Sequence, residues 1–216
     1  MAYIFIHGLG QGPNSWNQVL SDINLKAKVL RPDLSSFLSH KECNYENLYE
    51  AFCAFCQPEA EKLDLCGISL GGILALHYAI SHPERVNSLV LIGTQYVMPR
   101  KLLAIQNFMF RLMSEQKFEG IGFSKKDFIQ LSRTMAKLDF HSELTNIICP
   151  TLVVCGEKDS ANKKASTELA EKIPNAQLSI IEGCGHVVNQ QAPGALAEQL
   201  KVFGKRAYHE TWKYFF

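Results

Sequence analysis

Three side chains suited to nucleophilic catalysis lie far apart in the sequence, each in a glycine-containing stretch. Ser69 lies in Gly-Ile-Ser-Leu-Gly, Asp159 ends Gly-Glu-Lys-Asp, and His186 ends Gly-Cys-Gly-His. A serine hydroxyl is a weak nucleophile at neutral pH, so it needs a neighbouring base that a third group orients. Serine, histidine and aspartate are residue types that can fill those roles.

The residues around Ser69 have the pattern of a sharp turn between a strand and a helix. The apolar run 63–66 has the length of a buried strand, and apolar residues with helical spacing follow over 70–80. This is the context that a nucleophile elbow requires. The two flanking glycines let the chain reverse without a Cβ clash, and the helix start favours negative charge beside the serine. Alone, the motif also fits a glycine-rich turn with a solvent-facing serine.

Strands and helices alternate along most of the chain. Apolar runs predict strands at 3–6, 28–31, 63–66, 86–93, 151–155 and 177–181. Helices are expected at about 13–23, 46–56, 70–80, 101–114, 125–138, 163–172 and 193–208. This alternation predicts a mostly parallel sheet covered by helices on both faces. Each chemical stretch, including His7-Gly-Leu-Gly, follows a strand directly, so all should meet where sites in such sheets lie.

The composition is that of an ordinary globular protein. The chain has 216 residues, of which 47% are hydrophobic and 20% charged, and its formal net charge is +1. One domain, or one domain with an insertion, fits this length. No basic run suggests nucleic acid and no segment suggests a membrane span, so we expect a small neutral or apolar substrate. The sequence does not define an oligomeric state.

The cysteines indicate a reducing compartment. There are seven, an odd number, and several lie in apolar runs, as expected of buried thiols rather than a disulfide framework. Cys53 and Cys56 have redox spacing, but they lie in a helical stretch that favours simple packing. The first residues lack the basic region and apolar length of a signal peptide. We therefore expect a cytoplasmic protein.

The motifs together resemble the α/β-hydrolase superfamily, and the resemblance extends over nearly the whole chain. It implies that Ser69 attacks the substrate, His186 transfers the proton and Asp159 holds the imidazole. It also implies an oxyanion hole made by the backbone N–H groups of Leu9 and Leu70. The implied fold is an α/β-hydrolase core of about six strands, smaller than in many members, with 28–31 at a sheet edge.

Other residues compete for these roles. His7 adjoins the oxyanion loop, and holding that loop by hydrogen bonds is the favoured interpretation over proton transfer. Glu157 and Asp139 are alternatives to Asp159, which matches the motif position. His77, within the helix that follows Ser69, is interpreted as a packed or capping residue.

The strand pattern is interrupted over 96–148, which resembles the helical cap of the family. We therefore predict a core of residues 1–95 and 149–216, with a small cap at 96–148. Apolar residues are spread widely around 101–114, so one side of this helix could face a cavity. The residues predicted to line the substrate pocket are His7, Gly8, Phe108, Met109 and Met113.

The function predicted first is hydrolysis of a carboxylic ester through an acyl-serine intermediate. A lyase or carbon–carbon bond hydrolase of the menaquinone-pathway or ring-cleavage type is the first alternative. Its carboxylate substrates would need a cation such as Arg100, Arg111 or Arg133. A hydrolase-fold binding protein without turnover is the second alternative.

Neither a metal cluster nor a dinucleotide fingerprint stands out in the sequence, so no metal or cofactor is predicted. The aromatic segment 211–216 could dock on the body of the protein or on a neighbouring subunit, and the sequence does not decide between them.

Overall fold

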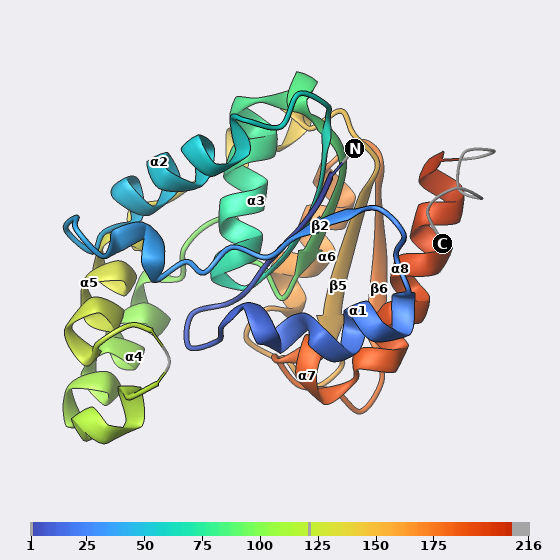
Figure 1. Ribbon diagram of the computed structural model, residues 1–216. Helices are drawn as coiled ribbons and strands as arrows, with labels where there is room; N and C mark the ends of the chain where they lie inside the picture. Colours follow the sequence, from blue (N-terminus) through green and yellow to red (C-terminus); the bar gives the residue numbers. More distant parts are fainter. Residues whose placement is uncertain (1, 121, 209–216) are drawn as a thin grey trace.

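A six-stranded parallel sheet organises the molecule (Figure 1). The computed structural model describes residues 2–120 and 122–208. The strands are β1 (Ala2–Ile6), β2 (Lys28–Leu30), β3 (Leu63–Ile68), β4 (Val86–Ile92), β5 (Thr151–Gly156) and β6 (Ala176–Ile181). Their order is β2-β1-β3-β4-β5-β6, and every neighbouring pair is parallel. The predicted fold class is confirmed, including the edge position of β2.

Helices cover both faces of the sheet. On one face α2 (Tyr45–Cys56), α3 (Leu70–Ser81) and α6 (Lys163–Lys172) pack over one hydrophobic core. On the other face α1 (Asn17–Ile23) and α8 (Pro193–Tyr208) contribute to a second core. The strands β3 and β5 are buried along their whole length, as continuous apolar strands between two helical layers should be.

The remaining elements are short, except for two helices between β4 and β5. These two are α4 (Arg100–Leu112) and α5 (Lys125–Met135), which Figure 1 shows as a separate pair beside the sheet. The short helix α7 is Val188–Gln191. The 3₁₀ segments are η1 (Pro13–Trp16), η2 (Ser36–Leu38), η3 (Pro83–Arg85), η4 (Glu115–Phe118) and η5 (His141–Asn146).

The helix predicted over 125–138 ends early, and backbone pairing explains why. The Met98 N–H donates to the Leu138 carbonyl (3.1 Å), and the Phe140 N–H donates to the Tyr96 carbonyl (2.8 Å). An isolated antiparallel bridge between Val97 and Asp139 lies among these bonds. After a turn at 136–137, the chain therefore makes extended backbone pairs over 138–140 rather than another helical turn.

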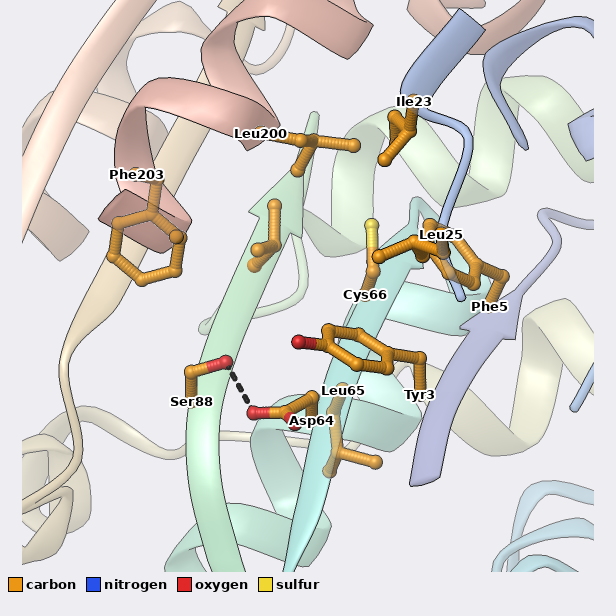
Figure 2. A pocket seen from close by; sticks show the side chains of 12 residues that line it. Tyr3, Phe5, Ile23, Leu25, Asp64, Leu65, Cys66, Ser88, Leu200 and Phe203 are labelled. Carbon is orange, nitrogen blue, oxygen red and sulfur yellow. Dashed lines mark hydrogen bonds between the residues drawn. The ribbon is translucent and has the colours of Figure 1, made fainter. Parts of the chain in front are cut away.

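A small cavity lies on the α8 side of the sheet (Figure 2). Its volume is about 40 Å³, and Cys66, Leu200 and Phe203 are among its lining residues. At one end the Ser88 hydroxyl donates to the buried Asp64 carboxylate at 2.7 Å. Asp64 is the second residue of β3, and none of the residues that line this cavity is a predicted catalytic residue.

None of the helices in the described part of the chain combines the length and hydrophobicity that a membrane span requires. The aromatic segment 211–216, for which docking was considered, lies outside the described residues.

His77 packs into an aromatic cluster between α2 and α3. Its ring stacks on Tyr49 with centroids 3.6 Å apart, and the Tyr45 hydroxyl lies 3.2 Å from Nδ1. Burial lowers the pKa of His77 from 6.5 to about 4, and the nearby His82 adds to the effect. His77 is therefore a neutral packing residue at neutral pH, in agreement with the interpretation from sequence.

Replacing His77 with phenylalanine should make stability less sensitive to acid. The unfolded chain binds a proton near pH 6.5 and the folded one only near pH 4, so the wild type loses stability as pH falls through that interval. His77→Phe removes this contribution but keeps a ring against Tyr49. The measurement is urea unfolding at pH 7 and pH 5. The exposed His40 supplies the control: His40→Phe should keep the wild-type difference, and an unchanged difference in His77→Phe would contradict the assignment.

Candidate active site

Ser69 lies at the turn between β3 and α3 in a strained backbone conformation. Its φ and ψ are 53° and −116°, unusual for a residue with a side chain. The Ser69 N–H donates to the Ile92 carbonyl (2.9 Å), and its carbonyl accepts from the Ile73 N–H (3.0 Å). These bonds to β4 and α3 hold Ser69 in its strained conformation. Backbone strain of this kind is typical of functional sites. The chain around Ser69 thus has the geometry of the predicted elbow.

Two glycines let the backbone pack closely around this turn. A Cβ on Gly71 would overlap the Ile6 carbonyl oxygen, so α3 could not approach β1 as it does. Gly93, which follows β4, has a φ of 52°, and a Cβ there would lie 2.9 Å from Nδ1 of His186. The motif identified the first glycine, but only the structure reveals the second.

The imidazole of His186 is hydrogen-bonded to the carboxylate of Asp159. Nδ1 of His186 lies 2.7 Å from Oδ2 of Asp159. Since an ionised carboxylate only accepts, Nδ1 carries the proton and Nε2 is left as the acceptor. The His186 side chain is 39% exposed, whereas the Asp159 side chain is 4% exposed. The histidine can therefore meet a substrate while its partner stays shielded from water.

Hydrogen bonding keeps Asp159 ionised despite its burial. Burial alone would raise the pKa of this carboxyl, but bonds from His186 and Asn162 outweigh it. The pKa therefore lies below its ordinary value. A carboxylate that stays charged can hold the imidazole tautomer and offset a positive charge on the ring.

A cavity of about 570 Å³ joins Ser69, Asp159 and His186. Its volume is within the usual range for small-molecule sites. The cavity lies among β-strand ends, α4 and α5. The other lining residues are Leu9, Leu70, Ile73, Gly93, Gln95, Met98, Pro99, Leu103, Ile105, Gln106, Met109, Phe110, Phe128, Ser132, Met135, Ala161 and Asn162. The wall is mainly apolar and contains neither lysine nor arginine within the described residues.

The predicted oxyanion-hole residues, Leu9 and Leu70, both line this cavity. Leu70 is the first residue of α3, so its N–H cannot bond within its own helix. For residues 2–120 and 122–208, no hydrogen bond occupies the N–H of Leu9 or Leu70. Both groups are available to a ligand.

Buried polar contacts fix the loop that carries Leu9. Nε2 of His7 accepts from the Leu34 N–H (3.2 Å), so Nδ1 donates to the Gly8 carbonyl (2.9 Å). Burial lowers the pKa of His7, which keeps the ring neutral. Gln11 accepts from the Gly8 N–H and donates to the buried Asn189 at 3.0 Å. These contacts agree with a loop-holding role for His7.

The five residues predicted for the pocket separate in space. Met109 lines the cavity, whereas His7 and Gly8 are not among its lining residues, although a Cβ on Gly8 would lie 3.4 Å from Cβ of Ser69. Phe108 is 62% exposed on an outer side of α4, and Met113 packs against the hydrophobic core. Apolar residues occupy more than one side of α4, so hydrophobicity alone could not identify which of them face the cavity. Phe108 and Met113 were predicted to line it for this reason.

The competing acids and cations lie elsewhere. Glu157 accepts from the Gly183 N–H (2.9 Å), and Asp139 accepts from the His141 N–H (3.0 Å). The three arginines considered as carboxylate anchors are not part of the cavity wall. Nε of Arg100 donates to the Ala136 carbonyl (3.2 Å), Arg133 lines a different hollow, and Arg111 is exposed.

The sequence interpretation missed several polar residues of the site. Asn162 contacts Asp159, Gln95 contacts Asn162, and Ser132 and Gln106 add polar groups to the cavity wall. The Ser132 hydroxyl is buried without a partner among the described residues. Asn162 follows Asp159 by three positions, which is the one local signal that could have pointed to it.

With this geometry established, comparison with known proteins defines the class. The model of the alpha/beta hydrolase family matches residues 3–199. The chain belongs to the α/β-hydrolase family.

Individual relatives are distant but extend over most of the chain. Similarity is found to a pimeloyl-[acyl-carrier protein] methyl ester esterase of Vibrio campbellii, with 22% identity over 236 residues and 93% of each chain covered. A 2-hydroxymuconate semialdehyde hydrolase of Pseudomonas sp. is 26% identical, over 85% of this chain and 79% of that protein. A crystal structure of a hydrolase from Pseudomonas aeruginosa matches with a TM-score of 0.81 and 18% identity, covering 94% and 89%. That structure supports the fold alone.

Proposed function

We propose that the protein is a carboxylic ester hydrolase that acts through an acyl-serine intermediate. The observation that carries the proposal is one cavity that joins Ser69, at the strained turn, to a His186–Asp159 pair bonded at 2.7 Å. The similarity to a curated methyl ester esterase supports the same class of reaction.

The proposed reaction assigns one task to each of these groups. Oγ of Ser69 attacks the ester carbonyl carbon while Nε2 of His186 takes its proton. The N–H groups of Leu9 and Leu70 stabilise the negative oxygen that develops. When the tetrahedral intermediate collapses, the C–O bond to the alcohol breaks and His186 returns the proton to the leaving oxygen. Water then attacks the acyl-serine while His186 takes its proton, and the intermediate collapses to release the acid as His186 returns the proton to Oγ of Ser69.

The apolar wall supports a neutral or apolar ester of small to medium acyl length as substrate. Residues 96–148, which supply much of this wall, are proposed to form the cap over the core of 1–95 and 149–216. Met98, Phe110, Phe128 and Met135 would contact the acyl chain. Because burying a carboxylate in an apolar cavity is unfavourable without a cation, this wall favours an uncharged acyl group.

The alternatives are less well supported. Lyase or carbon–carbon bond hydrolase substrates carry carboxylates, but Arg100, Arg111 and Arg133 do not line the cavity. A binding protein without turnover is disfavoured because the serine, histidine and aspartate line the same cavity as Leu9 and Leu70.

We also infer a reducing, cytoplasmic setting. The structure has all seven cysteines as free thiols, and five of them are buried. Burial raises the pKa of Cys66 and Cys56, which keeps these thiols protonated and unreactive.

A series of p-nitrophenyl esters tests the proposal. We expect turnover that peaks at a short to medium acyl chain and falls for long chains that exceed the cavity. An alkyl fluorophosphonate should abolish turnover and label Ser69 alone. Turnover that survives complete phosphonate treatment, or a label on another residue, would contradict the proposed mechanism.

A further inference from the structure

We propose that Asn162 and Gln95 are positioning residues that hold the Asp159 carboxylate in place, and through it the imidazole of His186. The inference rests on the proposed function, because it concerns the same site. Gln95 follows β4, Asn162 lies between β5 and α6, and His186 follows β6. The contacts therefore join three neighbouring strand ends of the sheet.

Asn162 contacts both carboxylate oxygens. Its Nδ2 lies 2.8 Å from Oδ1 and 2.9 Å from Oδ2 of Asp159. It also lies 3.1 Å from Nδ1 of His186. Since both nitrogens carry protons, they do not bond each other, and instead converge on the same carboxylate. Asn162 thus donates from beside the imidazole and restricts where the carboxylate can turn.

Gln95 fixes which end of the Asn162 amide faces the acid. Nε2 of Gln95 donates to the Ala161 carbonyl at 3.0 Å and to Oδ1 of Asn162 at 2.9 Å. A backbone carbonyl can only accept, so Gln95 must present its amide nitrogen there. Oδ1 of Asn162 is thereby occupied, and Nδ2 points to Asp159. The Ala161 carbonyl oxygen therefore determines the orientation of both amide groups.

The two amides do this without adding charge near the histidine. Among the described residues, Cys155 on β5 and Cys184 after β6 also interact with Asp159, and Lys163 and Lys158 interact with these two thiols in turn. Burial raises the pKa of both thiols, so they stay neutral in the range where an esterase works. A pH effect of removing Asn162 therefore belongs to the His186–Asp159 pair.

The test removes the amides one at a time and together. Asn162→Leu and Gln95→Met keep approximate size but cannot donate, and Asn146→Leu is the matched control on an exposed asparagine away from the cavity. The readouts are kcat and KM on a p-nitrophenyl ester, and the pH dependence of Ser69 phosphonylation by an alkyl fluorophosphonate. In that reaction the P–F bond breaks as the P–Oγ bond forms, fluoride leaves, and His186 takes the serine proton.

We expect Asn162→Leu to lower kcat and the labelling rate about tenfold, with KM within about twofold. The acid limb of labelling should move to higher pH, because a carboxylate without this donor holds the shared proton of the pair more tightly. Gln95→Met should have a smaller effect in the same direction. The double variant should be no slower than Asn162→Leu, since the residues act in series.

Wild-type rates and an unshifted acid limb in Asn162→Leu would overturn the inference, as would losses that multiply in the double variant. If the thermal midpoint of Asn162→Leu is near that of the wild type, general unfolding is excluded as the cause of its loss of rate. Gln95→Met tests the same positioning role at a second residue. If Ser69 of the wild type neither labels nor turns over an ester, the proposed function fails, and the positioning role with it. If the wild type labels normally and the variants match it, only the positioning role fails.

Discussion

Replacing Ser69 with alanine should reduce ester turnover by about 10⁴-fold or more while leaving the fold intact. The change removes the one hydroxyl that lies at the start of α3 on the wall shared with His186. The oxyanion donors and the apolar wall remain, so the variant should still bind the ester with a similar affinity. Small residual hydrolysis from these remaining features is expected.

The measurement is kcat/KM on the best p-nitrophenyl ester, with binding of a non-hydrolysable analogue followed separately. Ser21→Ala, on the exposed side of α1, makes the same chemical change away from the cavity and should match the wild type. Turnover in Ser69→Ala equal to the wild-type value would remove the proposed mechanism.

Replacing Gly71 with alanine should destabilise the protein by about 3 kcal/mol, the upper part of the range for overpacking. The added Cβ would overlap the Ile6 carbonyl oxygen and crowd that of His7. These are backbone atoms of β1 and the following loop, so no side-chain rotation can relieve the clash. Alanine favours a helix over glycine by about 1 kcal/mol, so helix propensity alone would stabilise the variant. A measured loss of stability would therefore come from the steric clash.

Gly12→Ala is the control, because a Cβ at this position meets nothing within 4 Å and φ is −135°. Its unfolding free energy should stay within about 0.5 kcal/mol of the wild type. Urea unfolding followed by circular dichroism measures both variants. Gly71→Ala with wild-type stability would show that α3 can move away from β1, contrary to the packing described.

The sequence was sufficient for the sheet and for the strand ends because each depends on local pattern. Continuous apolar runs marked β3 and β5, and a parallel sheet must bring their carboxyl ends to one edge. That rule is why Ser69, Asp159 and His186 could be identified as neighbours although 117 positions separate the first from the last. The roles assigned to them stay predictions until the variants are measured.

The features that could not be predicted depend on contacts between distant segments. Gln95 and Asn162 are 67 positions apart, and neither belongs to a periodic pattern or a motif. On α4, apolar residues face the core, the cavity and solvent, so composition did not separate Met109 from Phe108. The early end of α5 reflects backbone pairing with residues 96–98, which helical spacing does not anticipate.

The placement of the α4–α5 pair between adjacent strands affects how this scaffold can be altered. Residues 96–98 before the pair and 138–140 after it are joined by backbone hydrogen bonds and by the bridge between Val97 and Asp139, so the segment starts and finishes at adjacent points of the fold. An excursion that starts and finishes at adjacent points can change in length with little entropic penalty. The segment is therefore a natural place to graft foreign sequence, so that new selectivity could be engineered while the machinery beneath is kept.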